Sequence, residues 1–374
     1  MTGASAFQKD YKTIIPVEAL ARFVERLGEQ YTLTGPVGGG LTARFEDVSS
    51  FSQMDLDYQS TMLPPGKKYL FEPVQEVLSF DISEGRFLED HKDPQMRKRA
   101  LIGLHPCDVN AILYLDKVFL GQYTDPFYRI RRENIFTIAL NCKSVTDLCF
   151  CHLVGAGPYL KARSGYDILL TELRGLLTDS GVDSGGSGAD MDGGEKKFLL
   201  ELASEKARDL FHALSPDKGK PPEEKDLAKI KEMEAALLKT FKKNLDMEAV
   251  QNALLARPDH HALKETADSR CLSCSNCVMV CPTCFCHDVR DETDLALSRV
   301  KKIRRWDACQ DISFARVHGG NFRAQRYARL RQFVFHKLDY DTQFGMKATV
   351  GCGRCIRWCP TGIDLTEIAK AMME

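Results

Sequence analysis

The chain has 374 residues, 44% of them hydrophobic and 28% charged, and its formal net charge at pH 7 is −1. This balance excludes a globally disordered chain and a general attraction to nucleic acid, and the length is enough for two or three domains. Fourteen cysteines are the anomaly. The start of the sequence lacks the apolar core of a signal peptide, and no apolar run approaches the ~18–20 residues that span a bilayer. The cysteines therefore indicate metal-binding thiolates in a reducing cytoplasm rather than disulfides.

Residues 1–177 have the pattern of an α/β domain. Residues 16–30 begin on a proline and repeat apolar side chains at helical spacing, which predicts an amphipathic helix with Pro16 near its first turn. An apolar stretch at 109–120, predicted as a helix, lies between two short apolar runs that predict buried strands. This strand–helix–strand order favours an α/β fold. The predicted strands are residues 100–104, 134–140 and 165–173.

The middle of the chain, residues 178–259, is predicted to be a polar insert. Its first part, 178–197, is rich in glycine, serine and aspartate, as expected of an exposed loop or linker. Two segments dense in Lys, Glu, Leu and Ala follow, at 195–214 and 222–256, and both predict helices. The remaining residues, 260–374, contain two dense runs of cysteines and are expected to form a mostly α-helical domain.

Four cysteines in this last region have the spacing C-x2-C-x2-C-x3-C followed by proline: Cys271, Cys274, Cys277 and Cys281, with Pro282. In two-cluster ferredoxins the first three such thiolates hold one [4Fe–4S] cube and the fourth crosses to the other cube. A zinc site also uses C-x2-C pairs, but four tetrahedral ligands do not call for a cysteine triple followed by Cys-Pro. The spacing therefore favours an iron–sulfur centre.

A second run, CGRCIRWCP, ends on the same Cys-Pro pair but has Thr349 where a full motif would place its first cysteine. By the crossed assignment its last cysteine completes the first cube, and the second cube has one thiolate too few. Residues 260–374 are therefore predicted to be a ferredoxin-like domain with two [4Fe–4S] clusters. The predicted ligands are Cys271, Cys274, Cys277 and Cys359 for the first cube, and Cys281, Cys352 and Cys355 for the second.

The missing ligand of the second cube is best supplied by Cys309, in WDACQDISFA. It stands apart from the other cysteines, and the long insert between the two runs must fold back over the clusters. Cys284 and Cys286, which are close to Cys281 in sequence, are alternatives. If it is not a ligand, Cys309 is a small buried core residue.

Basic residues gather between the two cysteine runs, from Lys301 to Lys337. Cations there would stabilise the reduced state of a negatively charged cube and raise its potential. Equally, they would suit a face on which a partner docks, for which the arginine-rich segment 316–331, with Arg323 and Arg326, is the candidate. A solvated helix face is the alternative.

Four more cysteines lie in the α/β domain. Two of them directly follow predicted strands, and the other two form the nearby CFC sequence. Because sites in open α/β sheets gather beyond the carboxyl ends of strands, these four thiols are expected to come together. They predict a third iron–sulfur cluster, with a zinc site or a set of buried structural thiols as alternatives. The four are Cys107, Cys142, Cys149 and Cys151.

No catalytic centre is evident, so the sequence leaves open whether the chain is itself an enzyme. The glycines of residues 35–40 lack the G-x-G-x-x-G spacing of a dinucleotide site, and no phosphate loop or Ser–His–Asp order is present. Three histidines lie beside cysteines and are alternative ligands, although an ordinary hydrogen-bonding role is favoured for each. They are His105, His152 and His287.

Several segments together resemble a known family: HPCDVNAI, DPFYRIRREN, ALNC, CFC, GAGP, GYDILLTEL, CPTCFCHDV, WDACQDISFA, GGNFR and GCGRCIRWCP. Outside residues 178–260, the chain resembles the iron–sulfur beta subunit of sulfhydrogenases, which are cytoplasmic NAD(P)-linked nickel–iron hydrogenases, and the equivalent iron–sulfur subunit of anaerobic sulfite reductase. The last runs also match the helical two-cluster ferredoxin domain of heterodisulfide reductase-type proteins.

The resemblance implies an electron relay in a soluble anaerobic complex, between a flavin subunit that meets NAD(P)H and a separate catalytic subunit of hydrogenase or sulfite reductase type. One alternative is a heterodisulfide reductase-associated subunit that supplies electrons to a flavin-based bifurcating complex. An alternative of another class is a zinc-binding structural module. All of these interpretations expect partner proteins, and none expects nucleic acid or a membrane span.

Overall fold

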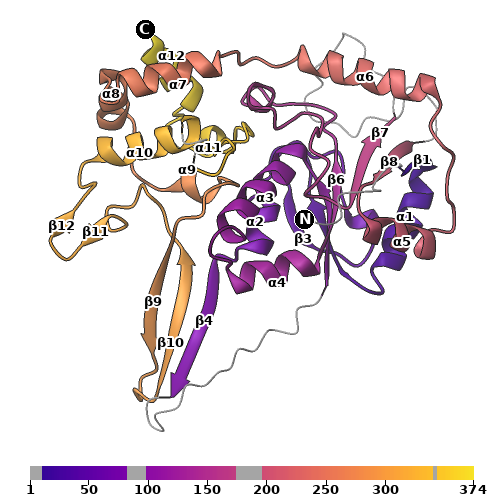
Figure 1. Cartoon of the computed structure of the whole chain (residues 1–374), viewed down its shortest axis with the longest axis horizontal. Helices are drawn as coiled ribbons and strands as arrows, with labels where there is room; N and C mark the ends of the chain where they lie inside the picture. The colour runs from indigo at the N-terminus through magenta and orange to yellow at the C-terminus, as the bar shows by residue number, and fades with distance from the viewer. Residues whose placement is uncertain (1–10, 82–97, 174–195, 340–342) are drawn as a thin grey trace, which may run out of the picture.

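The computed structural model describes residues 11–81, 98–173, 196–339 and 343–374. Its N-terminal part is built on a seven-stranded sheet with strand order β1-β8-β7-β6-β5-β2-β3 (Figure 1). Strands β2, β5, β6 and β7 are parallel, while the outer pairs β1–β8, β8–β7 and β2–β3 are antiparallel. The strands are β1 (Tyr11–Pro16), β2 (Thr32–Val37), β3 (Arg44–Asp47), β5 (Arg99–Leu104), β6 (Ile135–Leu140), β7 (Ile168–Glu172) and β8 (Lys197–Leu202).

Helices cover both faces of this sheet, because successive residues of a strand point to opposite sides. Ile102 packs in one buried core with residues of α1 (Val17–Leu27) and α5 (Glu205–Leu214). Leu101 packs in another, with residues of three helices. These helices are α2 (Pro65–Leu70), α3 (Pro106–Phe119) and α4 (Pro126–Asn134). The α/β prediction is thus confirmed, with strands and helices at the expected places; Pro16 is the N-cap of α1 rather than part of its first turn.

The polar middle of the chain joins both parts of the molecule. The helix predicted at 195–214 is wrong at its start: β8 occupies 197–202 and only α5 is helical. The apolar run in β8 is buried between β1 and β7, so tertiary pairing overrides its helix-forming composition. The segment predicted as one helix at 222–256 forms two, α6 (Glu224–Leu238) and α7 (Met247–Ala256). Most of the predicted loop at 178–197 lies outside the described residues.

The C-terminal part has its own buried core, formed largely by α7 and five further helices that enclose the cysteine runs. Among its described residues it also contains strands, so the expectation of a mostly α-helical domain is not confirmed. The helices are α8 (His261–Ser269), α9 (Asn276–Met279), α10 (Arg326–Leu338), α11 (Arg354–Arg357) and α12 (Leu365–Met373). The strands are β9 (His287–Thr293), β10 (Arg299–Trp306) and the short hairpin β11 (Arg316–Val317) with β12 (Gly320–Asn321).

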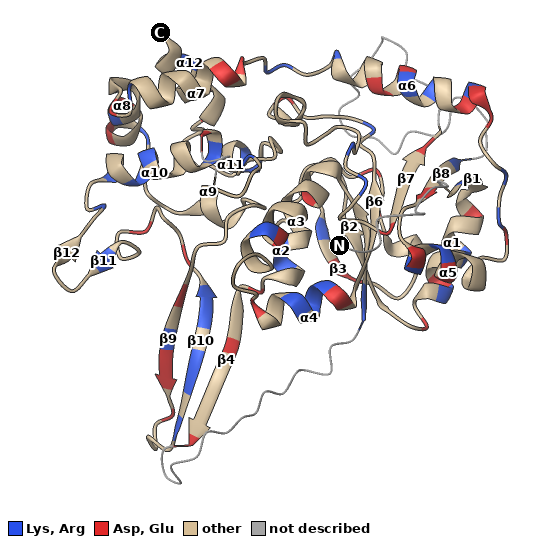
Figure 2. Cartoon of the chain, viewed as in Figure 1, with Lys and Arg blue, Asp and Glu red and all other residues tan. Residues whose placement is uncertain are grey.

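Strand β10 pairs with β9 on one side and with β4 (Val74–Asp81) of the N-terminal part on the other, forming a projecting three-stranded arm (Figure 1). Figure 2 shows basic residues along β10 beside acidic residues on β9. Lys302 pairs with Asp291 at 2.7 Å, and Lys301 pairs with Glu76 at 2.7 Å. This part of the basic segment is therefore neutralised within the arm.

Candidate metal centres

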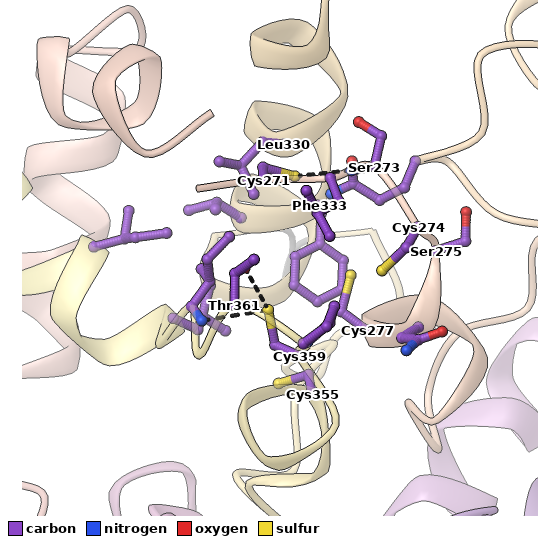
Figure 3. A pocket seen from close by; sticks show the side chains of 18 residues that line it. Cys271, Ser273, Cys274, Ser275, Cys277, Leu330, Phe333, Cys355, Cys359 and Thr361 are labelled. Carbon is purple, nitrogen blue, oxygen red and sulfur yellow. Dashed lines mark hydrogen bonds between the residues drawn. The ribbon is translucent and has the colours of Figure 1, made fainter. Parts of the chain in front are cut away.

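The first candidate centre is a cavity between the two cysteine runs. Figure 3 shows the sulfur atoms of Cys274, Cys277 and Cys359 around one space, beside Phe333 of α10. Backbone amides approach two of the thiols, with Ser273 N 3.4 Å from the sulfur of Cys271 and Ile363 N 3.3 Å from that of Cys359. Amide donors of this kind stabilise a thiolate. The cysteines that line the cavity are Cys271, Cys274, Cys277, Cys355 and Cys359.

Two one-turn helices give the cysteine runs the same local shape. Helix α9 follows Ser275, whose φ is 69°, and α11 follows Gly353, whose φ is 73°. Each left-handed residue reverses the chain just before its helix. Cys277 and Cys355 are consequently the second residues of their respective helices. The equivalence of the two runs that the sequence suggested is therefore present in the backbone.

The second cavity lies between the first cavity and the N-terminal part. Three cysteines line it, Cys281, Cys352 and Cys355. Thr349 also lines it, so the position where the motif lacks a cysteine faces the space in which a fourth ligand is needed. The lining is otherwise largely apolar, apart from the buried Lys337 of α10.

Three further cysteines of this region, Cys284, Cys286 and Cys309, do not line the cavity. Cys284 interacts with Cys281 of the lining, and Cys309 interacts with Cys286. A hydrogen bond from Cys284 lowers the pKa of Cys281, and Lys337 acts in the same direction. Cys284 thus lies next to Cys281, a predicted ligand of the second cube, while the assignment of Cys309 stays a prediction.

The third cavity contains all four cysteines of the α/β domain, at the carboxyl ends of β5 and β6. Cys107 is the second residue of α3, the helix that follows β5, and Cys142 is the second residue after β6. Cys149 and Cys151 come from the following loop. The structure therefore brings together the four thiols that the sequence grouped, and Cys352 of the second run lines the same cavity.

Close backbone contact fixes the loop of Cys149 and Cys151 against the second cysteine run. Phe150 N donates to Gly351 O at 2.8 Å. A Cβ atom on Gly351 would lie 2.5 Å from the backbone nitrogen of Cys151, and one on Gly353 would lie 2.7 Å from Leu148 O. Both glycines also have a positive φ, so no other residue fits there without moving the loop. These contacts set the spacing between the second and third cavities.

The buried thiols fit a metal cluster. Burial, with smaller contributions from neighbouring groups, raises the pKa of Cys352 to about 11 and that of Cys355 well above its ordinary value. Without a bound cation these thiols stay protonated, whereas a metal centre stabilises the thiolates that bind it. Among the described residues, no three His, Cys, Asp or Glu side chains converge closely enough for a single metal ion. Each of the first and third cavities is lined by at least four thiols, which is the number of ligands that a [4Fe–4S] cluster takes.

The histidines beside the cysteines have other contacts. His105 stacks on Tyr58 with the ring centres 4.2 Å apart, and burial lowers its pKa to about 4. His152 packs on the ring of Phe241, and His287 Nδ1 lies 3.1 Å from the carbonyl oxygen of Phe285. The hydrogen-bonding role favoured from the sequence is thus seen for His287, whereas His152 Nδ1 is buried without a hydrogen-bond partner among the described residues.

The arginine-rich segment 316–331 is only partly exposed. Arg316 and Arg326 are exposed and Arg323 is half-buried, whereas Arg329 is buried and donates to Ala324 O at 2.7 Å. Part of the segment therefore holds the loop before α10 in place. Phe322 of the same segment is 81% exposed.

Sequence reasoning missed the polar groups that hold the cavities together. Arg354 of α11 pairs with Asp108 of α3 in the interior, and Lys67 of α2 lies over the ring of Trp306 at 3.9 Å. No local pattern marks these residues, because their partners are far away in sequence. The motif HPCD does contain Asp108, but the sequence offered no reason to separate it from other aspartates.

Comparison with known proteins agrees with the cysteine geometry. Residues 270–363 match the family model described as a 4Fe-4S dicluster domain, so the chain is an iron–sulfur electron-transfer protein. It is 34% identical, over 96% of its own length and 97% of the relative's, to sulfhydrogenase 2 subunit beta of Pyrococcus furiosus. The chain therefore belongs to the sulfhydrogenase beta-subunit family. In the part of the chain that the structure describes, every helix is too short or too polar to cross a bilayer.

Proposed function

We propose that this chain is the iron–sulfur relay of a cytoplasmic multisubunit oxidoreductase and carries electrons through three clusters in sequence. The observation that carries the proposal is the order of the three thiol-lined cavities. Cys355 lines both the first and the second cavity, and Cys352 lines both the second and the third. When bound, an iron–sulfur cluster at each position would accept and donate single electrons. Each pair of neighbouring cluster sites would then share one lining cysteine.

The proposed ligands combine the crossed assignment from the sequence with the cavity linings. The first cluster would be held by Cys271, Cys274, Cys277 and Cys359, and the third by Cys107, Cys142, Cys149 and Cys151. For the second, Cys281, Cys352 and Cys355 would supply three ligands. The contact between Cys284 and Cys281 supports Cys284 as the fourth. The assignment of Cys309 to this position stays a prediction from the sequence, which the variants below test.

The two ends of the series suit exchange with other proteins of the complex. At the first cavity Cys274 is exposed, and neighbouring Leu272 is 62% exposed. At the third cavity, Ser144 is exposed in the lining. We propose that one end meets a flavin-containing, NAD(P)H-linked subunit, while the other meets a catalytic subunit of hydrogenase or sulfite reductase type. The chain itself would bind neither nicotinamide nor the final substrate.

The test uses the full chain, purified without oxygen, with iron and acid-labile sulfide measured beforehand. A strong artificial reductant should bleach its visible absorption, whereas NAD(P)H alone should not. Oxidation of NAD(P)H by the isolated chain, at a rate comparable to that of the assembled complex, would contradict the relay. Stoichiometric zinc in place of iron would contradict the cofactor assignment.

A further inference from the structure

Two buried lysines come from different parts of the molecule: Lys337 lines the second cavity, and Lys67 contacts the carbonyl oxygen of Val278 in the helix of Cys277. Lys337 is near the end of α10 and Lys67 is in α2 of the N-terminal part, and each side chain is only 2% exposed. An ammonium group loses its hydration on burial, which is costly unless a negative charge replaces it. Among the described residues, neither lysine has a carboxylate within ion-pair distance.

Hydrogen bonds connect Lys337 to the sulfur of Cys281 through the hydroxyl group of Thr283. Its Nζ donates to Thr283 Oγ1 and to Ala348 O, both at 2.9 Å. Thr283 Oγ1 is in turn 3.2 Å from the sulfur of Cys281 and 2.7 Å from Ala348 O. The lysine therefore reaches a proposed cluster ligand through one hydroxyl group, and it lines the same cavity.

The electrostatic balance at Lys337 agrees with this geometry. Burial alone would lower its pKa, but the thiols of Cys281 and Cys284 raise the pKa above its ordinary value. A thiolate at Cys281 or Cys284 would compensate the charge of the buried ammonium, and metal binding would stabilise such a thiolate.

Lys67 is a second buried cation, and it belongs to α2 of the N-terminal part of the molecule. Its Nζ lies over the ring of Trp306 at 3.9 Å and 3.5 Å from Val278 O, which belongs to the helix of Cys277. Burial lowers its pKa, while Cys284 and Cys281 oppose that effect. Because Lys67 is on α2, its position depends on how the two parts of the molecule pack.

We propose that Lys337, assisted by Lys67, acts as a fixed buried cation that raises the reduction potential of the cluster in the second cavity. The inference rests on the proposed function, since it needs a cluster there. Reduction adds one negative charge to the cluster, and a fixed positive charge in a low-dielectric interior stabilises that state. The second cluster would thereby hold an electron in preference to the first and third clusters.

The test is an anaerobic potentiometric titration of the full chain, followed by electron paramagnetic resonance, for Lys337→Met and Lys67→Met. For Lys337→Met we expect at least a tenfold fall in the ratio of reduced to oxidised second cluster at a fixed potential, a shift of about 59 mV for one electron. Lys67→Met should shift the same signal in the same direction by less. Lys301→Met is the matched control, because Lys301 is exposed and paired with Glu76.

Iron and sulfide content separates the failure of this inference from that of the proposed function. Wild-type protein without iron would overturn the proposed function itself. Wild-type protein with iron, together with lysine variants that keep both their iron and their potentials, would overturn only the role of the lysines. If both variants lose the second cluster, the lysines are needed for its assembly, and the claim about potential is wrong.

Discussion

Arg354 and Asp108 form a bidentate ion pair in the interior, with Nη1 2.8 Å from Oδ1 and Nη2 3.0 Å from Oδ2. Arg354 is 2% exposed and Asp108 is 1% exposed. The remaining donors of Arg354 reach Thr61, through Nε to its carbonyl and Nη2 to its hydroxyl, both at 2.9 Å. The pair thus joins the helix of Cys355 to the helix of Cys107, and it connects the second cavity to the third.

Replacing Asp108 by alanine should strongly destabilise the protein. The change leaves a buried guanidinium without its counter-charge, which typically costs about 3–5 kcal/mol. Anaerobic urea titration followed by circular dichroism measures the free energy of unfolding. The control is Glu76→Gln, which removes an exposed partner of Lys301 and should cost no more than about 1 kcal/mol. Equal effects of the two changes would show that the buried pair does not hold the domains together.

The iron content should report the third cluster. With three clusters the chain holds about twelve irons, and with only the two C-terminal clusters about eight. Cys142→Ser should lower the value from about twelve to about eight, because it removes one ligand of the third cavity only. Ser144→Ala, which changes a residue of the same cavity that is not a thiol, should leave the iron content unchanged. A wild-type value near eight would refute the third cluster.

The fourth ligand of the second cluster can be identified by three single substitutions. Cys284→Ala should make this cluster labile, whereas Cys309→Ala and Cys286→Ala should keep it. The reason is position: Cys284 N donates to Cys281 O at 3.4 Å, whereas Cys309 interacts with Cys286. Retention of the second cluster is measured by its paramagnetic signal after dilution in air. Loss of that signal in Cys309→Ala alone would instead support the assignment made from the sequence.

A gain of function at Thr349 offers an independent check of the same cavity. Thr349 lines it at the position where a complete motif has cysteine. Thr349→Cys should therefore slow the loss of the second cluster in air, since a fourth thiolate would come from within the second run. Thr349→Ser is the control, because it keeps a hydroxyl group and adds no thiolate. A cluster no more stable in Thr349→Cys than in Thr349→Ser would contradict the placement of Thr349 beside it.

The stability of the protein should depend on the charge of His336. Burial, with a smaller effect of Lys337, lowers the pKa of His336 to about 3. Since the folded state disfavours its protonation, the stabilising contribution is full above the unfolded pKa of ~6.5 and is lost as the pH falls toward about 3. The loss amounts to about 1.4 kcal/mol per pH unit in this window. Urea titrations at two pH values should show a smaller decrease for His336→Gln than for wild type, and equal decreases would contradict the prediction.

Strands and helices of the α/β part were largely predictable from local pattern. The apolar runs of β5 and β6 are bounded by turns and are too short for helices, so their period left little choice. Strand β8 was not predictable in this way. Its residues are compatible with a helix, and only pairing with β1 and β7 makes them a strand. The arm of β4, β10 and β9 was missed for the same reason, because β4 and β10 are more than two hundred residues apart.

The sequence by itself predicted the thiols of the first cluster, because the spacing of Cys271, Cys274 and Cys277 restricts where a tight loop can direct them. It also grouped the four N-terminal cysteines, since strand ends meet at one edge of a sheet. Only the tertiary structure showed that neighbouring cavities share lining cysteines, that Cys284 lies beside Cys281, and that Lys337 lines the second cavity while Arg354, paired with Asp108, lines the third. These contacts join residues tens to hundreds of positions apart, and the free energy of such long-range packing leaves no periodic signal in the chain.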